Sequence, residues 1–343
     1  MIISASRRTD IPAFYTRWFM NRIRAGHSMV ANPFRRDQIR RVSLLPQDVD
    51  VLVFWSKNPA PMLPHLETLR RGGYRFVFQF TLNDYPACFE PHVPPLEDRI
   101  RTFLDLADRV GSGLVVWRYD PIIVSRATDF AYHARRFERL ARRLAGRTRR
   151  VVVSLVDRYR KAERNMATIQ DESHRVDWTA SERPGMDELL KELSALAVGF
   201  DMEIRSCAEP EDRTRCGVRP GGCIDAGLLA RLHDITVAQG RDRGQREACL
   251  CAVSRDIGTP NTCAHGCRYC YATQSPELAT RRLAGHDPGT NAIEGDLTDA
   301  AGVSEPPARP ATAGPLACRR SASPRQAGAP GTGAASRCRP AAA

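Results

Sequence analysis

The chain has 343 residues, of which 42% are hydrophobic and 26% are charged, proportions that are typical of a globular protein. This length suits one large domain or two ordinary ones. No run of about 18 apolar residues occurs, so we expect no membrane-spanning helix. The first ten residues contain no apolar core behind a basic start, so we expect no secretory signal and a cytoplasmic location.

The formal net charge is +12. Residues 301–343 contain six Arg and one Glu and so contribute +5 of this charge. Another share lies in the arginine-rich stretch 133–150, "HARRFERLARRLAGRTRR". The commoner interpretation of such a stretch is the solvated face of a helix. The alternative is a surface for a phosphate-bearing partner such as a nucleic acid.

Residues 1–206 alternate between short apolar runs and amphipathic runs, which predicts strands alternating with helices. In chain order we expect strand 1–6, helix 13–26, strands 28–32 and 50–56, helix 59–73, strand 75–81, helix 96–111, strand 113–119, helix 129–146, strand 150–156, helix 185–199 and strand 201–206. Several helices end on glycine, as at Gly26. Strands that are apolar throughout predict a parallel sheet covered on both faces. Seven of them indicate an α/β fold of the (β/α) barrel type, TIM-like or partial, over residues 1–206; an open doubly wound sheet is the alternative.

Polar residues follow every predicted strand. The carboxyl ends of parallel strands share one rim, where barrel enzymes place their active sites. We therefore expect a polar pocket in which four cations hold a carboxylate or phosphate: Arg7, Arg8, Lys57 and Arg118. Four acids are expected to orient hydroxyls or amines, or to transfer protons: Asp10, Asp120, Asp157 and Glu209. Further strand-end residues are candidates for contacting a cofactor: Asn32, Trp55, Ser56, Asn58 and Gln79.

A late loop, "NTCAHGCRYCYAT", holds three cysteines at the spacing C-x-x-x-C-x-x-C: Cys263, Cys267 and Cys270. A [4Fe–4S] cluster normally has four thiolate ligands, so three leave one iron open to a small molecule. Radical S-adenosylmethionine (SAM) enzymes use this arrangement, and Tyr269 matches the aromatic residue that commonly precedes their last cysteine. Two alternatives are a zinc site with His265 as a further ligand and a redox dithiol at Cys267 and Cys270.

Most of the eleven cysteines lie between positions 207 and 270, and such clustering in a reducing compartment favours metal binding over disulfides. Four of them are candidates for a second cluster: Cys207, Cys223, Cys249 and Cys251. Alternatively, some are ordinary buried cysteines, and Cys88 and Cys216 fit neither set. We expect residues 207–297 to form a cysteine-rich region packed on the barrel rim. Residues 298–343, which include Cys318 and Cys338, are predicted to be a disordered low-complexity tail.

Several segments carry a resemblance to a known family: "SASRRTDIPAFY", "NPF", "FWSKNP", "QFTLNDY", "WRYDPI", "SCAE", "CID", "CLCAVSRDIGTPNTCAHGCRYCYA" and "HDP". Over roughly residues 1–297 the chain resembles the bacterial and archaeal family called domain of unknown function 1848. The resemblance implies a relation to radical SAM enzymes, with some likeness to the spore photoproduct lyase group. It also implies that Cys207, Cys223, Cys249 and Cys251 accompany the last three cysteines, whereas Cys216 is not typical.

The cysteine loop follows the last predicted strand, whereas radical SAM enzymes usually carry it after the first. In a closed ring the first and last strands are neighbours, so we expect the loop to face Arg7, Arg8 and Asp10. No clear "GGE"-type segment for the SAM amino group follows an early strand.

These patterns predict an iron–sulfur enzyme of radical SAM type that acts on a polar or anionic substrate, a small molecule or nucleotide. The expected cofactors are one or two [4Fe–4S] clusters and SAM, with flavodoxin or ferredoxin as electron donor. The first alternative is a non-radical [4Fe–4S] enzyme whose open iron acts as a Lewis acid. The second is a zinc-stapled protein that binds nucleic acid.

Overall fold

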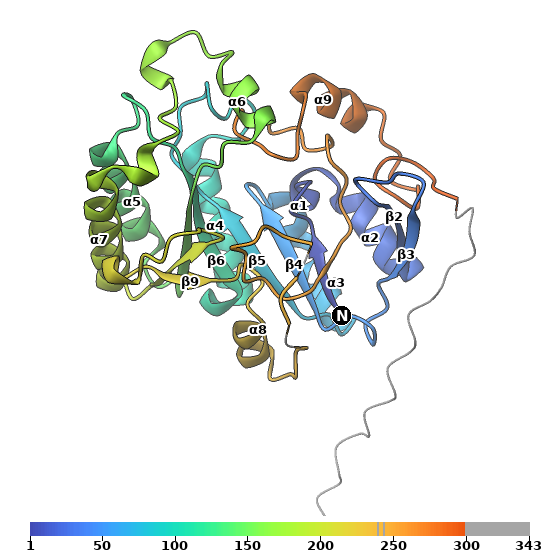
Figure 1. Ribbon diagram of the computed structural model, residues 1–343. Coiled ribbons are helices and arrows are strands. Elements are labelled where there is room, and N and C mark those ends of the chain that lie inside the picture. The colour runs from blue at the N-terminus through green and yellow to red at the C-terminus, as the bar shows by residue number, and fades with distance from the viewer. Residues whose placement is uncertain (239, 243, 299–343) are drawn as a thin grey trace, which may run out of the picture. The chain divides into compact units, whose positions relative to one another are not determined.

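A computed structural model describes residues 1–298 except 239 and 243. Its centre is an eight-stranded sheet in which all paired neighbours are parallel, in the order β10-β1-β4-β5-β6-β7-β8-β9 (Figure 1). The strands are β1 (Ile2–Ala5), β4 (Val51–Ser56), β5 (Phe76–Thr81), β6 (Val115–Ile122), β7 (Arg150–Leu155), β8 (Glu203–Cys207), β9 (Arg219–Gly221) and β10 (Arg255–Asp256). The predicted tail 298–343 lies outside the described residues, except for its first position.

The helices are α1 (Ile11–Phe14), α2 (Thr16–Ala25), α3 (Leu66–Arg71), α4 (Leu96–Val110), α5 (Phe130–Leu144), α6 (Arg160–Met166), α7 (Pro184–Gly199), α8 (Ala226–His233) and α9 (Pro276–Ala284). Gly26 ends α2 in the left-handed conformation, with φ of 72°, as glycine does most easily. Among the described residues, no helix is both long enough and apolar enough to cross a bilayer.

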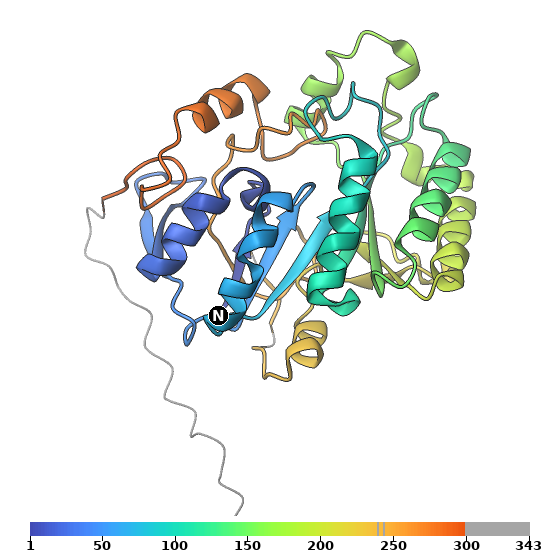
Figure 2. The same cartoon turned by 180° about the vertical axis from the view of Figure 1, so that it is seen from behind.

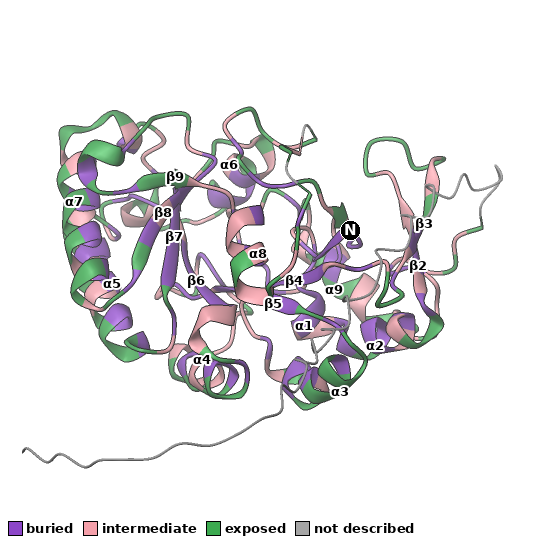
Figure 3. Cartoon of the chain, turned by 90° about the horizontal axis from the view of Figure 1, so that it is seen from below, coloured by how far each residue is buried: buried purple, intermediate pink, exposed green. Residues whose placement is uncertain are grey.

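The sheet is buried on both faces, as its apolar strands predict. In β4, Leu52 and Phe54 pack with the helices on one face, whereas Val51 and Val53 belong to a second core on the other face. Figure 2 shows α3 and α4 in front of the first face. The strands at the centre are buried along most of their length (Figure 3). The second core is made with α8 and with cysteine-bearing coil instead of a layer of several helices.

The strand expected at 28–32 is not part of the large sheet. It forms β2 (His27–Ala31), which pairs only with the antiparallel strand β3 (Ile39–Ser43) in a separate hairpin. The prediction that this strand lies in the parallel sheet was wrong. The seven residues 32–38 are too few for a crossover, so they return the chain antiparallel to β2, and β2 finds its hydrogen-bonding partner in β3.

A (β/α) barrel, TIM-like or partial, was expected. The described residues show a parallel sheet of eight strands, without a β-ladder between the two edge strands β9 and β10 that would close it. Both strands are short, and Pro220 in β9 has no N–H to donate to a ladder. The segment that follows β9 and the segment that precedes β10 are still in contact, because the Ala252 N–H donates to the Ile224 carbonyl at 2.9 Å. A Cβ on Gly222 would lie only 2.6 Å from the Leu250 carbonyl oxygen. The gap in the sheet is therefore bridged by the segments that carry Cys223 and Cys251.

Candidate active site

A cavity of about 300 Å³ lies at the carboxyl ends of the strands. Its lining includes both predicted sets of cysteines: Cys207, Cys223, Cys249, Cys251, Cys263, Cys267 and Cys270. Ten other residues proposed from the sequence also line it: Arg7, Arg8, Asp10, Trp55, Ser56, Lys57, Arg118, Asp120, Asp157 and Tyr269. The ends of β1, β4, β5, β6, β7 and β8 therefore meet around one cavity, whereas the end of β2 does not.

Four proposed residues lie outside this lining. Asn32 donates to Gln38 within the β2–β3 hairpin, and Asn58 accepts from the Ala60 N–H at 3.4 Å, where a 3₁₀ turn leads the chain away from the rim. Gln79 donates to the Cys223 carbonyl at 2.7 Å, so it supports the backbone of a cysteine that lines the cavity and does not line the cavity itself. Glu209 lines a small neighbouring cavity and accepts from the Leu155 N–H at 2.8 Å.

The three-cysteine loop lies beside the end of β1, as expected. β10 pairs with β1 at Ser4 and Asp256, and the loop follows β10 directly. His265, inside the loop, has its Nε2 atom 2.8 Å from Oδ2 of Asp10. From the other side the Arg268 N–H donates to the Phe89 carbonyl at 2.9 Å. Although this loop comes late in the sequence, it therefore lies next to the first strand of the sheet.

The environment of this loop favours neutral thiols in the absence of a bound cation. Burial, with the Asp10 carboxylate nearby, raises the pKa of Cys263 to about 12. Burial also raises the pKa of Cys267 well above its usual range, and the nearby Lys57 ammonium only partly opposes this. Cys263 and Cys267 would therefore become thiolates most readily on binding a metal. The Nδ1 atom of His265 has no hydrogen-bond partner among the described residues.

The other four cysteines form another part of the cavity lining. The sulfurs of Cys207 and Cys223 lie 2.6 Å apart, and the Ile224 N–H donates to the Cys251 sulfur at 3.4 Å. Hydrogen bonds from Cys223 and Cys249, together with the Arg7 charge, hold the pKa of Cys251 well below its usual range. In the described part of the chain, no group of three or more His, Cys, Asp or Glu side chains is arranged to hold a single metal ion.

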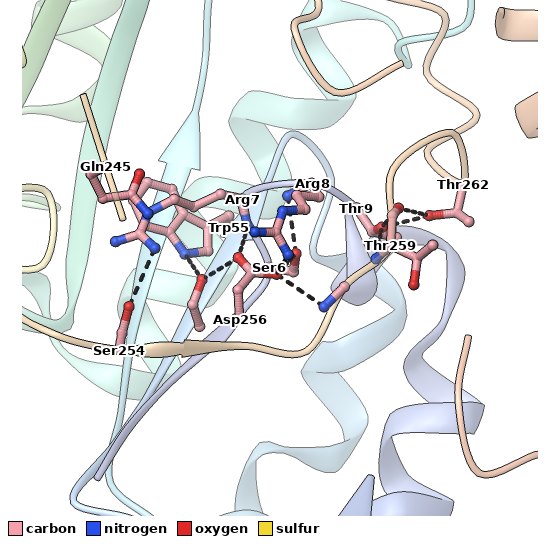
Figure 4. A network of polar contacts seen from close by, with 12 residues as sticks. Ser6, Arg7, Arg8, Thr9, Trp55, Gln245, Ser254, Asp256, Thr259 and Thr262 are labelled. Carbon is pink, nitrogen blue, oxygen red and sulfur yellow. Dashed lines mark hydrogen bonds and ion pairs between the residues drawn. The ribbon is translucent and has the colours of Figure 1, made fainter. Parts of the chain in front are cut away.

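Asp256 organises the loop after β1 (Figure 4). Its carboxylate accepts from the Arg7 N–H at 2.9 Å and from the hydroxyls of Ser4 and Ser6 at 2.9 and 2.5 Å. The Arg7 guanidinium lies 5.2 Å from the centre of the Trp55 ring. Sequence reasoning missed Asp256 because it belongs to a strand of only two residues, which has no recognisable periodicity.

Glu90 is a second residue that the sequence did not reveal. It is buried, pairs with Lys57 Nζ at 2.8 Å and accepts a short hydrogen bond from the Tyr269 hydroxyl. Arg99 on α4 lies 4.0 Å from its other oxygen. The nearby cations hold its pKa below the usual range despite the burial. Glu90 therefore fixes the Lys57 ammonium beside the cysteine loop.

The acids on the opposite side of the cavity are also paired. Asp120 accepts from Arg118 at 2.5 and 3.1 Å and from the Ser154 hydroxyl, and Asp157 pairs with Arg246. Burial raises the pKa of Glu209 to about 7. Glu209 is thus a carboxyl group that can hold or release a proton near neutral pH, in the small cavity next to this side of the site.

Most of the arginine-rich stretch lies in α5, which ends at Leu144, and much of its charge is matched by acids. Arg136 and Arg139 pair with Asp84, and Arg139 and Arg143 pair with Glu97. Arg142 pairs with Glu138 one turn away. This arrangement fits a solvated helix face better than a surface prepared for phosphates.

The parallel sheet and the cysteine-lined cavity define a cysteine-rich α/β protein with a large polar site at the ends of its strands. The chain belongs to the family described as domain of unknown function (DUF1848), whose model matches residues 2–272. The match includes all seven cysteines of the cavity. No curated protein and no solved structure matches the chain.

Proposed function

We propose that the protein is an iron–sulfur enzyme of radical SAM type that acts on a polar or anionic substrate, built on an incomplete (β/α) barrel. The observation that carries the proposal is that the three-cysteine loop, the four upstream cysteines and the charged strand ends all line one cavity. A purely structural metal site would have no need to share a cavity with so many polar side chains.

The cysteines suit this cofactor chemically. Thiolates are soft ligands that favour iron–sulfur clusters and zinc, and three of them in one short loop leave a cluster with one open iron. A [4Fe–4S] cluster held by Cys263, Cys267 and Cys270 would supply reductive cleavage of the SAM sulfonium, with an electron from a flavodoxin or ferredoxin. Cys207, Cys223, Cys249 and Cys251 would hold a second cluster.

The chain's own side chains would bind and orient the substrate. Arg7 and Arg8, on the loop after β1, offer guanidinium donors to a carboxylate or phosphate. Lys57 adds a positive charge that Glu90 holds in place. Glu209, whose pKa is raised to about 7 by burial, can hold a proton next to the cavity wall. The Trp55 ring provides an apolar surface that excludes water from its side of the site.

The alternatives differ in how well the residues support them. A non-radical enzyme with the open iron as a Lewis acid would use the same cysteines and the same cavity. A zinc-stapled nucleic-acid-binding protein is less well supported, because Arg136, Arg139 and Arg143 of α5 already have acidic partners.

Anaerobic reconstitution tests the proposal. The protein is incubated with iron, sulfide and dithionite, and the visible spectrum and the cleavage of SAM are measured. We expect [4Fe–4S] absorbance and SAM cleavage, with cleavage lost in the Cys263→Ala/Cys267→Ala/Cys270→Ala variant. Cys88→Ala, a cysteine outside the cavity lining, is the matched control and should retain both. A cluster that never cleaves SAM would favour the Lewis-acid alternative, and zinc without iron would contradict both iron–sulfur functions.

A further inference from the structure

The two cysteine sets have different side-chain neighbours around the same cavity. Two arginines lie beside the four-cysteine set, that is Cys207, Cys223, Cys249 and Cys251, and one of them donates to a sulfur. The three-cysteine loop lies beside Asp10 and Lys57, and the Lys57 ammonium donates to Glu90. Electrostatics around a cluster, and hydrogen bonds to its sulfurs, set its reduction potential. The two sets are therefore expected to differ in reduction potential.

Arg118 makes the closest contact with the four-cysteine set. Its Nη1 atom donates to the Cys223 sulfur at 2.6 Å, while Nε and Nη2 bind Asp120. The side chain is buried and lies 5.2 Å from the Trp55 ring. Asp120 and Trp55 thus hold one guanidinium N–H aimed at a ligand sulfur.

Arg7 supplies a second positive charge. Its guanidinium, on a partly buried side chain, lies near Cys251 and Cys223 and 5.2 Å from the Trp55 ring. Its Nη1 atom donates weakly to Ser254 at 3.3 Å, whereas Nη2 is buried without a hydrogen-bond partner in the described residues. A buried guanidinium N–H without an acceptor is costly, so this donor requires a negatively charged or polar group within the cavity.

The three-cysteine loop has no comparable side-chain donor to its sulfurs among the described residues. Lys57 lies near Cys267, but its ammonium donates to Glu90 at 2.8 Å. Beside Cys263 lies the Asp10 carboxylate, which is bonded to His265. Reduction adds negative charge to a cluster, and the Arg118 N–H that donates to the Cys223 sulfur stabilises that charge directly, although the same guanidinium is also paired with Asp120.

We propose that Arg7 and Arg118 tune the four-cysteine set to a higher reduction potential than the three-cysteine loop, so that it takes up the first electron entering the cavity. This inference rests on the proposed function, because it requires iron–sulfur clusters in both sets. It makes the four-cysteine set the first acceptor of an electron from the flavodoxin or ferredoxin, and it gives Arg7 and Arg118 a role in addition to any contact with substrate.

The test separates the two sets. One background, Cys263→Ala/Cys267→Ala/Cys270→Ala, keeps only the four-cysteine set, and the other, Cys207→Ala/Cys223→Ala/Cys249→Ala/Cys251→Ala, keeps only the loop. Midpoint potentials are measured by redox titration with electron paramagnetic resonance. We expect the higher potential in the first background. There Arg118→Gln and Arg7→Gln should each lower it, and Arg118→Lys should lower it less than Arg118→Gln.

The controls identify the cause of any shift. Arg215→Gln removes an exposed arginine that pairs with Asp187 and should leave both potentials unchanged. Arg118→Gln should also leave the potential of the three-cysteine background unchanged. If either multiple-alanine variant fails to fold, the wild-type protein is reduced with less than one electron per chain from dithionite. The first electron paramagnetic resonance signal to appear should then belong to the four-cysteine set.

Failure of the inference and failure of the proposed function give different results. Equal potentials, a higher potential for the loop, or no shift in Arg118→Gln and Arg7→Gln would overturn the inference and leave the proposed function standing. A protein that assembles no iron–sulfur cluster would overturn the proposed function, and the inference with it.

Discussion

Nε2 of His265 lies 2.8 Å from Oδ2 of Asp10, across a separation of 255 positions in the chain. Both side chains are buried. The same carboxylate accepts from the Lys57 N–H at 2.8 Å and from the Ala13 N–H at 3.0 Å. Asp10, the N-cap residue of α1, therefore joins α1, the end of β4 and the loop that carries the last three cysteines.

Asp10→Asn should loosen this junction. The amide can still cap α1, but it loses the charge that strengthens the bond to His265. We expect the free energy of unfolding to fall by about 1–3 kcal/mol, measured by urea unfolding, with less iron retained after reconstitution. Asp37→Asn, at an exposed position of the β2–β3 hairpin, is the control and should change neither. Equal stability of Asp10→Asn and wild type would show that the junction does not hold the loop.

The buried Lys57–Glu90 pair makes a different prediction. Glu90→Gln leaves the Lys57 ammonium without its charged partner and should lower the free energy of unfolding by about 3–5 kcal/mol. Lys57→Met/Glu90→Gln should lose less than the sum of the two single changes, because neither charge is then left unpaired. The exposed pair of Glu67 and Arg71 is the reference, where Glu67→Gln should cost less than about 1 kcal/mol. Additive effects at Lys57 and Glu90 would contradict the pairing.

A substitution at Gly222 tests whether stability and iron binding depend on the contact across the gap between β9 and β10. A methyl group there would lie 2.6 Å from the Leu250 carbonyl oxygen and 3.1 Å from the Cys251 Cα atom. Gly222→Ala should therefore separate Cys223 from Cys251, lower the stability by about 1–3 kcal/mol and lower the iron content. Gly199→Ala, where nothing lies within 4 Å of the added carbon, is the matched control. Full iron content in Gly222→Ala would show that the two segments need not touch.

His133 predicts a dependence of stability on pH. It is buried between the Tyr119 hydroxyl at 2.9 Å and the Ile123 carbonyl at 3.0 Å, and burial lowers its pKa from 6.5 to about 4. Between these two values the unfolded chain binds a proton that the folded protein does not. Stability should therefore fall as the pH drops from about 6.5 to about 4, by up to about 3 kcal/mol from this residue.

Urea unfolding at pH 7 and pH 4.5 measures this effect. His133→Gln removes the titrating group, so its stability should change less between the two pH values than that of the wild type. His27→Asn, on the β2–β3 hairpin, should keep the wild-type difference. An unchanged pH dependence in His133→Gln would mean that other groups cause the loss.

The sequence revealed much of the sheet and part of the site because those features are local. Apolar runs predicted β1 and β4–β8, and the polar residues that follow them, such as Arg7 and Lys57, do line one cavity. Cysteine spacing identified the three-cysteine loop, and the adjacency of the first and last strands predicted its place beside Asp10. The hairpin β2–β3 was misplaced because apolarity alone does not distinguish a parallel strand from one arm of a hairpin.

The partners of the charged residues could not be predicted, because they come from distant and irregular segments. Asp256 lies on a two-residue strand, and Glu90 lies in the loop before α4. Gln79 was expected at the rim, yet its side chain supports Cys223 from behind. The hydrogen bond from Arg118 to the Cys223 sulfur likewise depends on the folded chain, because the two residues are 105 positions apart.

The central claim is that both cysteine sets hold iron–sulfur clusters in one cavity. The most direct test is the iron, sulfide and zinc content of anaerobically purified protein, compared with the Cys263→Ala/Cys267→Ala/Cys270→Ala variant. We predict iron and sulfide in equal amounts in the wild type, because a [4Fe–4S] cluster holds as many sulfides as irons. The variant should contain about half of each, because it keeps only one of the two clusters. Zinc with neither iron nor sulfide would contradict the claim.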